Sequence, residues 1–295
     1  MLEAFQEHRA LLFSIAYRML GSVSEAEDIV QETYLRWQRQ TADGIRSAKA
    51  WLTSTTTRLC IDELRSARKR REEYVGVWLP EPLVEEATDH RGADRAAALA
   101  DSLSTAFLVL LETLSPKERA VFLLREVFEY GYPEISGMVE ASEASCRQMV
   151  HRARDHVASR NARYDPNPGQ NERLVHEFLA TCRRGDTKQL LSLLTEDAVI
   201  YSDGGGRIAA APHPIIGRQR VARFLIGVNK LNRGVIETRF AAINSSPGVL
   251  LFANGELLQT ISVEIVDGRV QTIYVMRNPE KLKHLVPAAG GGGEP

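Results

Sequence analysis

The spacing of apolar residues changes once along this chain, and this change most constrains the fold. From Phe5 to about residue 160, apolar residues such as Leu12, Ile15 and Met19 recur at three- and four-residue steps, which is the period of amphipathic helices. Beyond a break at Tyr164–Gly169, runs of β-branched and aromatic residues have the character of strands. The sequence therefore predicts a helical part followed by a part that combines helices with a sheet.

The length of 295 residues predicts two or three compact units, at roughly 100–200 residues per domain. A stretch rich in proline, glycine and acids interrupts the helical pattern after about residue 72, which is typical of a linker. We expect five parts: a helical unit at 1–72, the linker at 73–94, a second helical unit at 95–164, a mixed domain at 165–286 and a disordered tail at 287–295.

Several short signals predict where elements begin and turn. Ser22 or Ser24 can cap one helix, and Ser115 before Pro116 can cap another. The pair Asp267-Gly268 separates two β-branched runs, which is typical of a two-residue hairpin. For the mixed domain we expect a curved antiparallel sheet packed by helices at residues 170–195 and 218–231.

Composition excludes several classes of protein. Cys60, Cys146 and Cys182 lie far apart, so we expect no disulfide framework and no zinc site built from cysteines. No cluster of His, Cys or acidic residues has the spacing of metal ligands, so we expect no metal site, and we expect no cofactor. No leader sequence is visible at the N-terminus, and no window approaches the ~18 apolar residues of a membrane span, so we expect a cytoplasmic protein that does not contact membranes. The net charge of −1 means that nucleic-acid binding would depend on local basic patches.

One such patch follows Trp51. Residues 58–71 hold six basic side chains against two acidic ones. Basic groups contact phosphates, and an exposed aromatic ring can hold an unstacked base. The alternative is a solvated helix end with Trp51 in the core.

A second patch has the layout of a helix-turn-helix. A helix from about Tyr132 would precede a turn and a second helix capped by Ser142. Five apolar side chains can face inward: Ile135, Val139, Cys146, Val150 and Ala153. The side chains that point outward suit base edges and phosphates in the major groove: Arg147, Gln148, His151, Arg152 and Arg154. The alternative is an ordinary helical hairpin.

These motifs over residues 5–160 resemble the extracytoplasmic-function sigma factors of bacterial RNA polymerase. The segments Ala16–Ser22 and Ala26–Tyr34 resemble region two, which implies that the clamp of the largest core subunit contacts Asp28, Gln31 and Glu32. The segment from Ala50 to Arg65 resembles the part that melts and reads the minus-ten promoter element, which implies roles for Trp51, Arg58, Arg65 and Arg68. The helix-turn-helix resembles region four, which reads the minus-thirty-five element, chiefly through Arg147 and Gln148.

The rest of the chain resembles a subgroup with a SnoaL-like C-terminal extension of the nuclear-transport-factor-two cone fold. The resemblance rests on a linker motif, a glycine-rich motif and the terminal motif Asn278–Leu282. It implies two helical sigma domains followed by an α+β domain that regulates them in cis. The first two motifs would mediate that regulation: Trp78, Leu79, Pro80, Glu81, Pro82, Asp203, Gly204, Gly205, Gly206 and Arg207. A contact between Arg207 and a carboxylate such as Glu81 is conceivable.

The predicted function is a sigma factor that binds core polymerase and promoter DNA, is regulated by its last domain and is not an enzyme. The alternative is a DNA-binding protein whose last domain is a small-molecule sensor or an enzyme of the cyclase or isomerase type. Asp203, Tyr201 and His213 would then be the acid–base candidates.

Overall fold

The computed structural model describes residues 1–40, 45, 47–85, 103–158, 168–231 and 236–285. The chain forms two compact units. The helical unit comprises Met1–Glu73, Asp94–Leu103 and Phe107–Asn161, and the sheet unit comprises Tyr74–Ala93, Ser104–Ala106 and Ala162–Pro295. Residues 86–94 of the predicted linker and the whole predicted tail, 287–295, lie outside the described residues.

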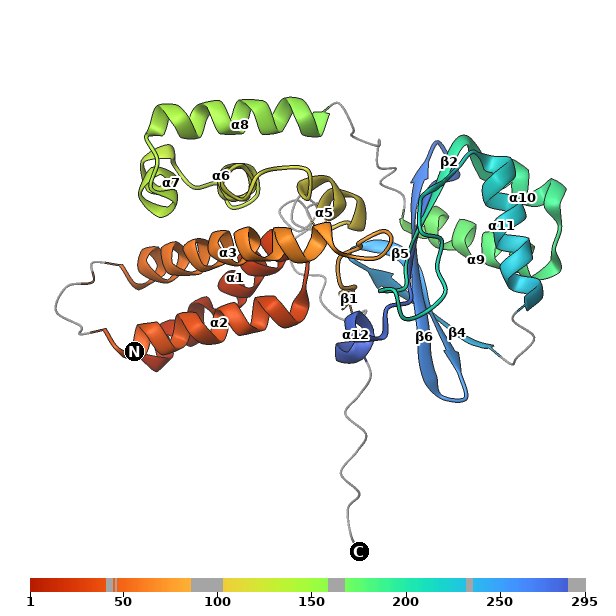
Figure 1. Ribbon diagram of the computed structural model, residues 1–295, viewed down its shortest axis with the longest axis horizontal. Coiled ribbons are helices and arrows are strands. Elements are labelled where there is room, and N and C mark those ends of the chain that lie inside the picture. The colour runs from red at the N-terminus through yellow and green to blue at the C-terminus, as the bar shows by residue number, and fades with distance from the viewer. Residues whose placement is uncertain (41–44, 46, 86–102, 159–167, 232–235, 286–295) are drawn as a thin grey trace, which may run out of the picture. The chain divides into compact units, whose positions relative to one another are not determined.

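The helical unit begins with three helices that run alongside one another (Figure 1): α1 (Leu2–Leu20), α2 (Val23–Gln38) and α3 (Ala48–Glu72). Gly21 ends α1 in the left-handed conformation, with φ of 67°, where glycine has no steric penalty. The Ser22 hydroxyl then accepts the Glu25 N–H at the start of α2, so the predicted cap is confirmed for Ser22. Buried residues of all three helices form one core: Phe5, Leu12, Val30, Trp37 and Leu52.

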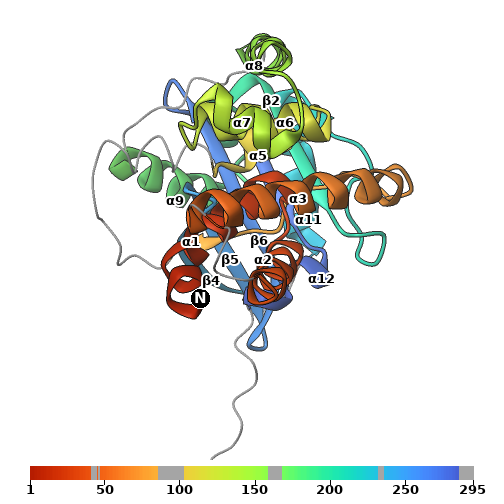
Figure 2. The same cartoon turned by 90° about the vertical axis from the view of Figure 1, so that its left-hand side faces the viewer.

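Among the described residues, this unit also holds most of α5 (Thr105–Leu111) and all of α6 (Pro116–Glu126), α7 (Tyr132–Val139) and α8 (Glu143–Ala158). Ser115 and Glu118 form a reciprocal capping box at the start of α6. Helices α6 and α7 lie between α8 and α3 (Figure 2). The helix-turn-helix prediction is confirmed for α7 and α8, because all five apolar side chains expected to face inward are buried: Ile135, Val139, Cys146, Val150 and Ala153. Glu140 takes the left-handed conformation in the turn, with φ of 52°, where glycine is more usual.

The sheet unit holds one seven-stranded sheet of order β1-β4-β5-β6-β7-β2-β3. Its elements are β1 (Val84–Glu85), α9 (Pro168–Arg184), α10 (Thr187–Leu193), β2 (Leu194–Asp203), β3 (Ile215–Ile216), α11 (Arg218–Leu231), β4 (Ile236–Ile243), β5 (Ser246–Ala253), β6 (Glu256–Val266), β7 (Arg269–Met276) and α12 (Pro279–Leu282), followed by a 3₁₀ turn at Lys283–Leu285. The antiparallel prediction is wrong for one pair, because β2 and β7 are parallel. The long chain between them, which includes α11, supplies the crossover that a parallel pair requires.

Two-residue turns connect the consecutive strands from β4 to β7, that is, β4 to β5, β5 to β6 and β6 to β7. The predicted hairpin at Asp267-Gly268 is confirmed, with φ of 50° and 69° at the two residues. Both angles are positive, as in the tight turns whose twist matches that of the strands. Asn244-Ser245 and Asn254-Gly255 turn in the same way.

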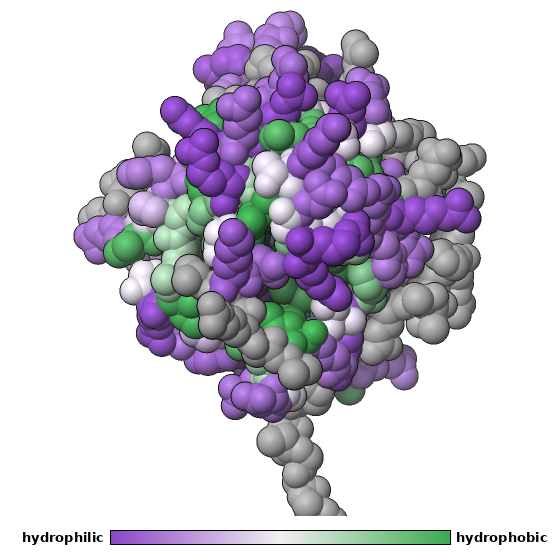
Figure 3. All heavy atoms as spheres, turned by 90° about the vertical axis from the view of Figure 1, so that its right-hand side faces the viewer, coloured by the Kyte–Doolittle hydropathy of each residue, from purple (hydrophilic) through white to green (hydrophobic). Residues whose placement is uncertain are grey.

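The core of the sheet unit lies between one face of the sheet and helices α9, α10 and α11 (Figure 1). Its buried members come from helices and strands alike, among them Phe178, Leu190, Val221, Val263 and Ile273. The side of the molecule on which α10 and α11 lie is largely hydrophilic (Figure 3). This pattern of one apolar and one polar side is typical of helices that cover a sheet.

The linker contributes a strand that the sequence did not indicate. Val84 pairs with Ile243 and Glu85 with Ala242 at the edge of the sheet, as the antiparallel strand β1. The Asn244 N–H donates to the Leu83 carbonyl at 2.7 Å, and the Asn244 side-chain oxygen accepts the Leu83 N–H at 3.2 Å. Part of the linker is therefore a component of the sheet unit.

Candidate polymerase, promoter and linker sites

The residues predicted to contact polymerase lie together on α2. Asp28, Gln31 and Glu32 are separated by three and four positions, so they share one helix face. Asp28 and Gln31 are exposed, whereas Glu32 is half-buried and accepts the Arg36 guanidinium at 2.7 Å. This arrangement presents an acidic and polar surface to a partner.

Trp51, whose ring was predicted to hold an unstacked base, belongs partly to the core. Its ring is half-buried, and the centroid lies 5.3 Å from that of Trp37. Trp51 packs against the core cluster of α1, α2 and α3. Only the exposed part of the indole can meet a base.

The Arg58 side chain of α3 donates hydrogen bonds to the helix-turn-helix. Its Nη2 donates to the Gly137 carbonyl at 2.8 Å and its Nε to the Met138 carbonyl at 3.1 Å. These carbonyls lie at the C-terminal end of α7, where the helix dipole is negative. The Glu140 carboxylate lies 3.5 Å from the same guanidinium. Arg58 therefore joins α3 to α7 in this form of the protein.

Of the other two predicted minus-ten residues, Arg65 is exposed and pairs with Asp62 at 3.1 Å. Arg68 lies within α3, but its side chain is outside the described residues.

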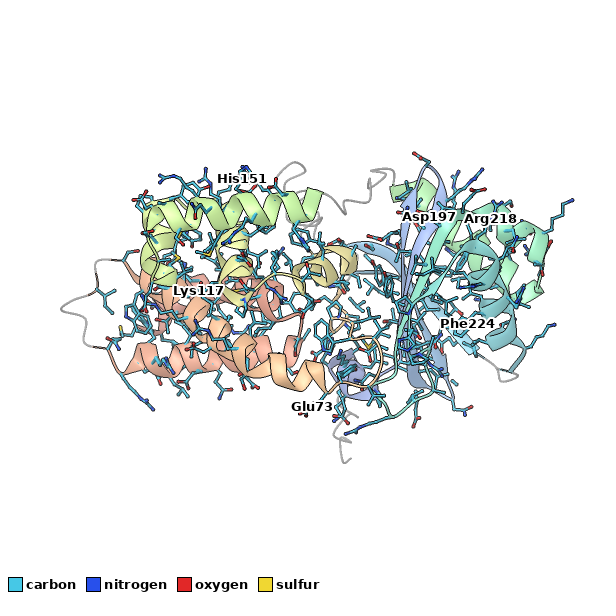
Figure 4. The ribbon with its side chains drawn as sticks, turned by 45° about the horizontal axis from the view of Figure 1, so that its top comes forward. Glu73, Lys117, His151, Asp197, Arg218 and Phe224 are labelled. Carbon is cyan, nitrogen blue, oxygen red and sulfur yellow. The ribbon has the colours of Figure 1, made fainter. Side chains whose placement is uncertain are left out.

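The predicted minus-thirty-five residues are all exposed on α8: Arg147, Gln148, His151, Arg152 and Arg154. Figure 4 labels His151 on the outer side of this helix. A carboxylate lies within 4 Å of each basic side chain, in the pairs Arg147–Glu143, His151–Asp155, Arg152–Glu118 and Arg154–Glu126. Arg154 donates two hydrogen bonds to the Glu126 carboxylate, and these raise the pKa of Arg154. Exposed pairs such as these are worth little energy, so phosphates can replace the carboxylates.

Buried polar contacts also hold the two halves of the helical unit together. Arg119 of α6 is 3% exposed. Its Nη1 donates to the Met19 carbonyl of α1 at 2.6 Å and to the Glu112 carboxylate at 2.7 Å. The hydroxyls of Thr53 and Tyr130 lie 3.2 Å apart, and burial raises the pKa of Tyr130. The packing is therefore specific and depends on partners far apart in the sequence.

Asp203 is the centre of a linker anchor in the sheet unit. This last residue of β2 is 1% exposed. Its carboxylate accepts the Leu79 N–H at 2.9 Å, the Gly205 N–H at 3.0 Å, the Lys281 ammonium at 2.8 Å and the Tyr74 hydroxyl. Burial and this hydrogen bond raise the pKa of Tyr74. One carboxylate thus connects the linker, the glycine-rich turn and the C-terminal helix α12.

Lys281 completes this anchor. Its ammonium donates to the Leu79 carbonyl and lies 4.2 Å from the ring centroid of Trp78 and 4.9 Å from that of Tyr74. A buried ammonium with a carboxylate, a carbonyl and two aromatic rings has the partners that its charge requires. The terminal motif contains Lys281 but indicates no role for it, and no pattern in the sequence points to Tyr74. The motif itself was the only available signal.

The glycine-rich turn permits close approach of its neighbours. A Cβ at Gly204 would lie 2.0 Å from the Ile208 carbonyl oxygen. At Gly205, where φ is 63°, a Cβ would lie 2.4 Å from the Asn278 side chain, which donates to the Tyr74 hydroxyl at 2.9 Å. Glycine is therefore required here by both space and conformation.

The suggested contact between Arg207 and Glu81 is wrong. Arg207 pairs instead with Glu280 at 2.6 Å on the surface. Glu81 is 7% exposed, between the buried Pro80 and Pro82, whereas Arg207 lies in an exposed turn and its side chain is 64% exposed. Hydrogen bonding from Lys283, together with Arg207, lowers the pKa of Glu280.

The three acid–base candidates are not assembled into a site. Asp203 already accepts four donors, the Tyr201 ring stacks on Tyr274 with centroids 5.6 Å apart, and His213 is exposed. Among the described residues, no hydrogen bond joins these three side chains, and no cluster of three His, Cys, Asp or Glu side chains could hold a metal ion. Nor is any described helix long and apolar enough to span a bilayer.

Comparison with known proteins agrees with this arrangement. Residues 4–70 match the model for Sigma-70 region 2, and residues 104–157 match that for Sigma-70 region 4. The ECF RNA polymerase sigma factor SigJ of Mycobacterium tuberculosis is 36% identical over 95% of this chain and 91% of its own length. The probable ECF RNA polymerase sigma factor SigI of the same species is 31% identical over 98% and 97%.

Among solved structures, that of Mycobacterium tuberculosis SigJ is similar, with a TM-score of 0.75 and 31% identity over 96% of this chain and 98% of the SigJ chain. The likeness covers the helical sigma regions and the α+β domain that follows them, so the predicted fold class is confirmed. The chain belongs to the family of extracytoplasmic-function sigma factors of RNA polymerase, and it carries a SnoaL-like C-terminal domain.

Proposed function

We propose that this sigma factor, which directs RNA polymerase to promoters, is controlled in cis by its sheet domain through the anchored linker. The observation that carries the proposal is the Asp203 anchor. The linker leaves region 2 at the end of α3, is held by the sheet domain at residues 74–85 and then leads to region 4. A movement of the sheet domain would therefore also move the linker that connects region 2 to region 4. Sigma factors are not enzymes, and they act with the polymerase in the cytoplasm.

The packing within the helical unit supports a second step, an opening before promoter binding. The minus-ten and minus-thirty-five elements are about 25 base pairs apart, or about 85 Å along B-form DNA at 3.4 Å per step. In the structure, Arg58 of region 2 is 2.8 Å from the Gly137 carbonyl of region 4. The two regions cannot keep this contact while each reads its own element. We infer that the structure represents a closed form.

In vitro transcription with core polymerase on a promoter library tests this function. The full chain should give transcripts that start downstream of a shared two-part element. A chain that ends near Arg163, and the full-length Asp203→Asn variant, should both change the yield if the sheet domain regulates in cis. Equal yields from all three proteins would contradict the regulatory role, and transcripts without a shared element would contradict the promoter roles given to α3 and α8.

Asp28→Arg should weaken binding to core polymerase at least about tenfold, because charge reversal places a cation in the proposed acidic contact, where like charges cost several kcal/mol. Fluorescence anisotropy of labelled protein titrated with core polymerase measures the change. Glu7→Arg is the matched control, since Glu7 is exposed on α1 outside the proposed contact. Equal affinity of the Asp28 variant and the wild type would remove Asp28 from the contact.

Arg147→Ala should cost about 1–3 kcal/mol at one base pair of the minus-thirty-five element and relax the preference there, as expected for a bidentate contact to guanine. Arg152→Ala is the comparison. Arg152 is expected to contact a phosphate, and the loss of a phosphate contact weakens binding to all sequences equally. Binding to a set of single-base variants of the element measures both. Uniform weakening by Arg147→Ala would make Arg147 a phosphate contact instead.

A further inference from the structure

The Tyr132 ring lies close to two guanidinium groups, one from α6 and one from α8. Tyr132 is the first residue of α7 and is half-buried. The guanidinium carbon of Arg147, from α8, lies 4.8 Å from the centroid of its ring, and that of Arg125, from α6, lies 5.0 Å away. Both distances are within the ~6 Å at which an aromatic ring attracts a cation.

Hydrogen bonds hold the backbone on both sides of Tyr132. The Glu134 carboxylate accepts the Gly131 N–H at 2.9 Å, and Pro133 follows in the first turn of α7. Arg125 donates to the Tyr130 carbonyl at 3.1 Å. These contacts on both sides of Tyr132 hold the start of α7 in place.

Arg147 is held by two partners and still reaches solvent. Its Nη2 donates to the Glu143 carboxylate at 3.0 Å, one turn earlier on α8, and the side chain is 57% exposed. A free arginine side chain loses rotamer entropy when it is ordered. The ring and the carboxylate impose much of this order before DNA arrives, which favours a bidentate contact.

We propose that Tyr132 is a positioning residue for promoter recognition, whose ring holds the Arg147 guanidinium ready to contact a base of the minus-thirty-five element. This inference rests on the proposed base contact of Arg147. The interaction needs the face of the ring and not the hydroxyl. Arg154, by contrast, is oriented by the two oxygens of Glu126.

The test compares full-length Tyr132→Phe, Tyr132→Leu, Arg147→Ala and the double variant Tyr132→Leu/Arg147→Ala, each bound to core polymerase. The probes are duplexes with the preferred minus-thirty-five element, its single-base variants and an unrelated sequence. Tyr132→Leu should reduce discrimination about twofold to fivefold, as expected for the loss of a cation–π contact, and only at the base pair that Arg147→Ala affects. Tyr132→Phe should retain the wild-type preference, and the double variant should lose no more than Arg147→Ala.

Each contrary result is distinguishable. If Arg147→Ala relaxes one position and Tyr132→Leu does not, the positioning role is wrong and the base contact stands. If Arg147→Ala relaxes no position, the base contact and the positioning role both fail. Equal weakening on every duplex by Tyr132→Leu, or the same loss from Tyr132→Phe, would show that the residue supports the fold instead. Circular dichroism melting of each variant identifies such a structural loss.

Discussion

Asp203→Asn is expected to lower the free energy of unfolding of the sheet unit by about 3–5 kcal/mol, the usual loss when one partner of a buried ion pair is removed. The Lys281 ammonium would remain buried, with its side chain only 10% exposed, and without the carboxylate 2.8 Å away. The new amide would also turn N–H groups toward donors such as the Leu79 N–H. Repulsion between donors adds to the loss.

Chemical denaturation followed by circular dichroism measures this change. Glu280→Gln is the matched control, because it breaks a pair of similar length, Arg207–Glu280 at 2.6 Å, whose side chains are 64% and 43% exposed. Exposed pairs contribute about 0–1 kcal/mol, so the control should remain close to the wild type. Equal losses from Asp203→Asn and Glu280→Gln would contradict the role of burial.

A double variant separates the ion pair from other effects of Asp203. Asp203→Asn with Lys281→Met removes both charges and should recover part of the lost stability, because no uncompensated charge then remains buried.

Hydrogen exchange gives a local readout of the linker. The Leu79 N–H should exchange faster in Asp203→Asn, since its acceptor is weakened. Unchanged protection of Leu79 would show that Asp203 does not hold the linker.

Arg119→Met is expected to destabilise the helical unit by about 3 kcal/mol, because it removes the charged donor of two hydrogen bonds, one of them to a carboxylate. The Met19 carbonyl and the half-buried Glu112 would lose contacts of 2.6 Å and 2.7 Å. The first of these contacts joins α1 to α6. Loosening them should also favour opening of region 2 from region 4.

Denaturation of the full chain measures the stability change, with Arg9→Met as the control. Arg9 pairs with Glu27 at 2.6 Å, but both side chains are about half exposed, at 53% and 46%, so a loss of no more than about 1 kcal/mol is expected. Transcription at a temperature where the variant is folded should be equal to or greater than that of the wild type. Lower transcription by folded Arg119→Met would contradict the closed form.

Features that depend on neighbouring residues followed from the sequence. The caps at Ser22 and Ser115, the buried face of the helix-turn-helix and the turn at Asp267-Gly268 each depend on interactions within a few positions. Side-chain caps, helical period and positive φ act locally, so residue types at a given spacing are sufficient to predict them. The same local patterns carried the resemblance to the two sigma regions.

The tertiary structure decided which distant residues meet. Asp203 and Lys281 are 78 positions apart, Tyr74 and Asp203 are 129 apart, and Arg58 and Gly137 are 79 apart. These residues pair because the folded chain brings distant segments together. The parallel pairing of β2 with β7 and the pairing of the linker strand β1 with β4 depend on the tertiary structure in the same way. The sequence by itself determined the elements and the surfaces they present, whereas the partners of Arg58, Asp203 and Arg207 were decided by packing, because a charged side chain can pair with any suitable group that the fold brings within reach.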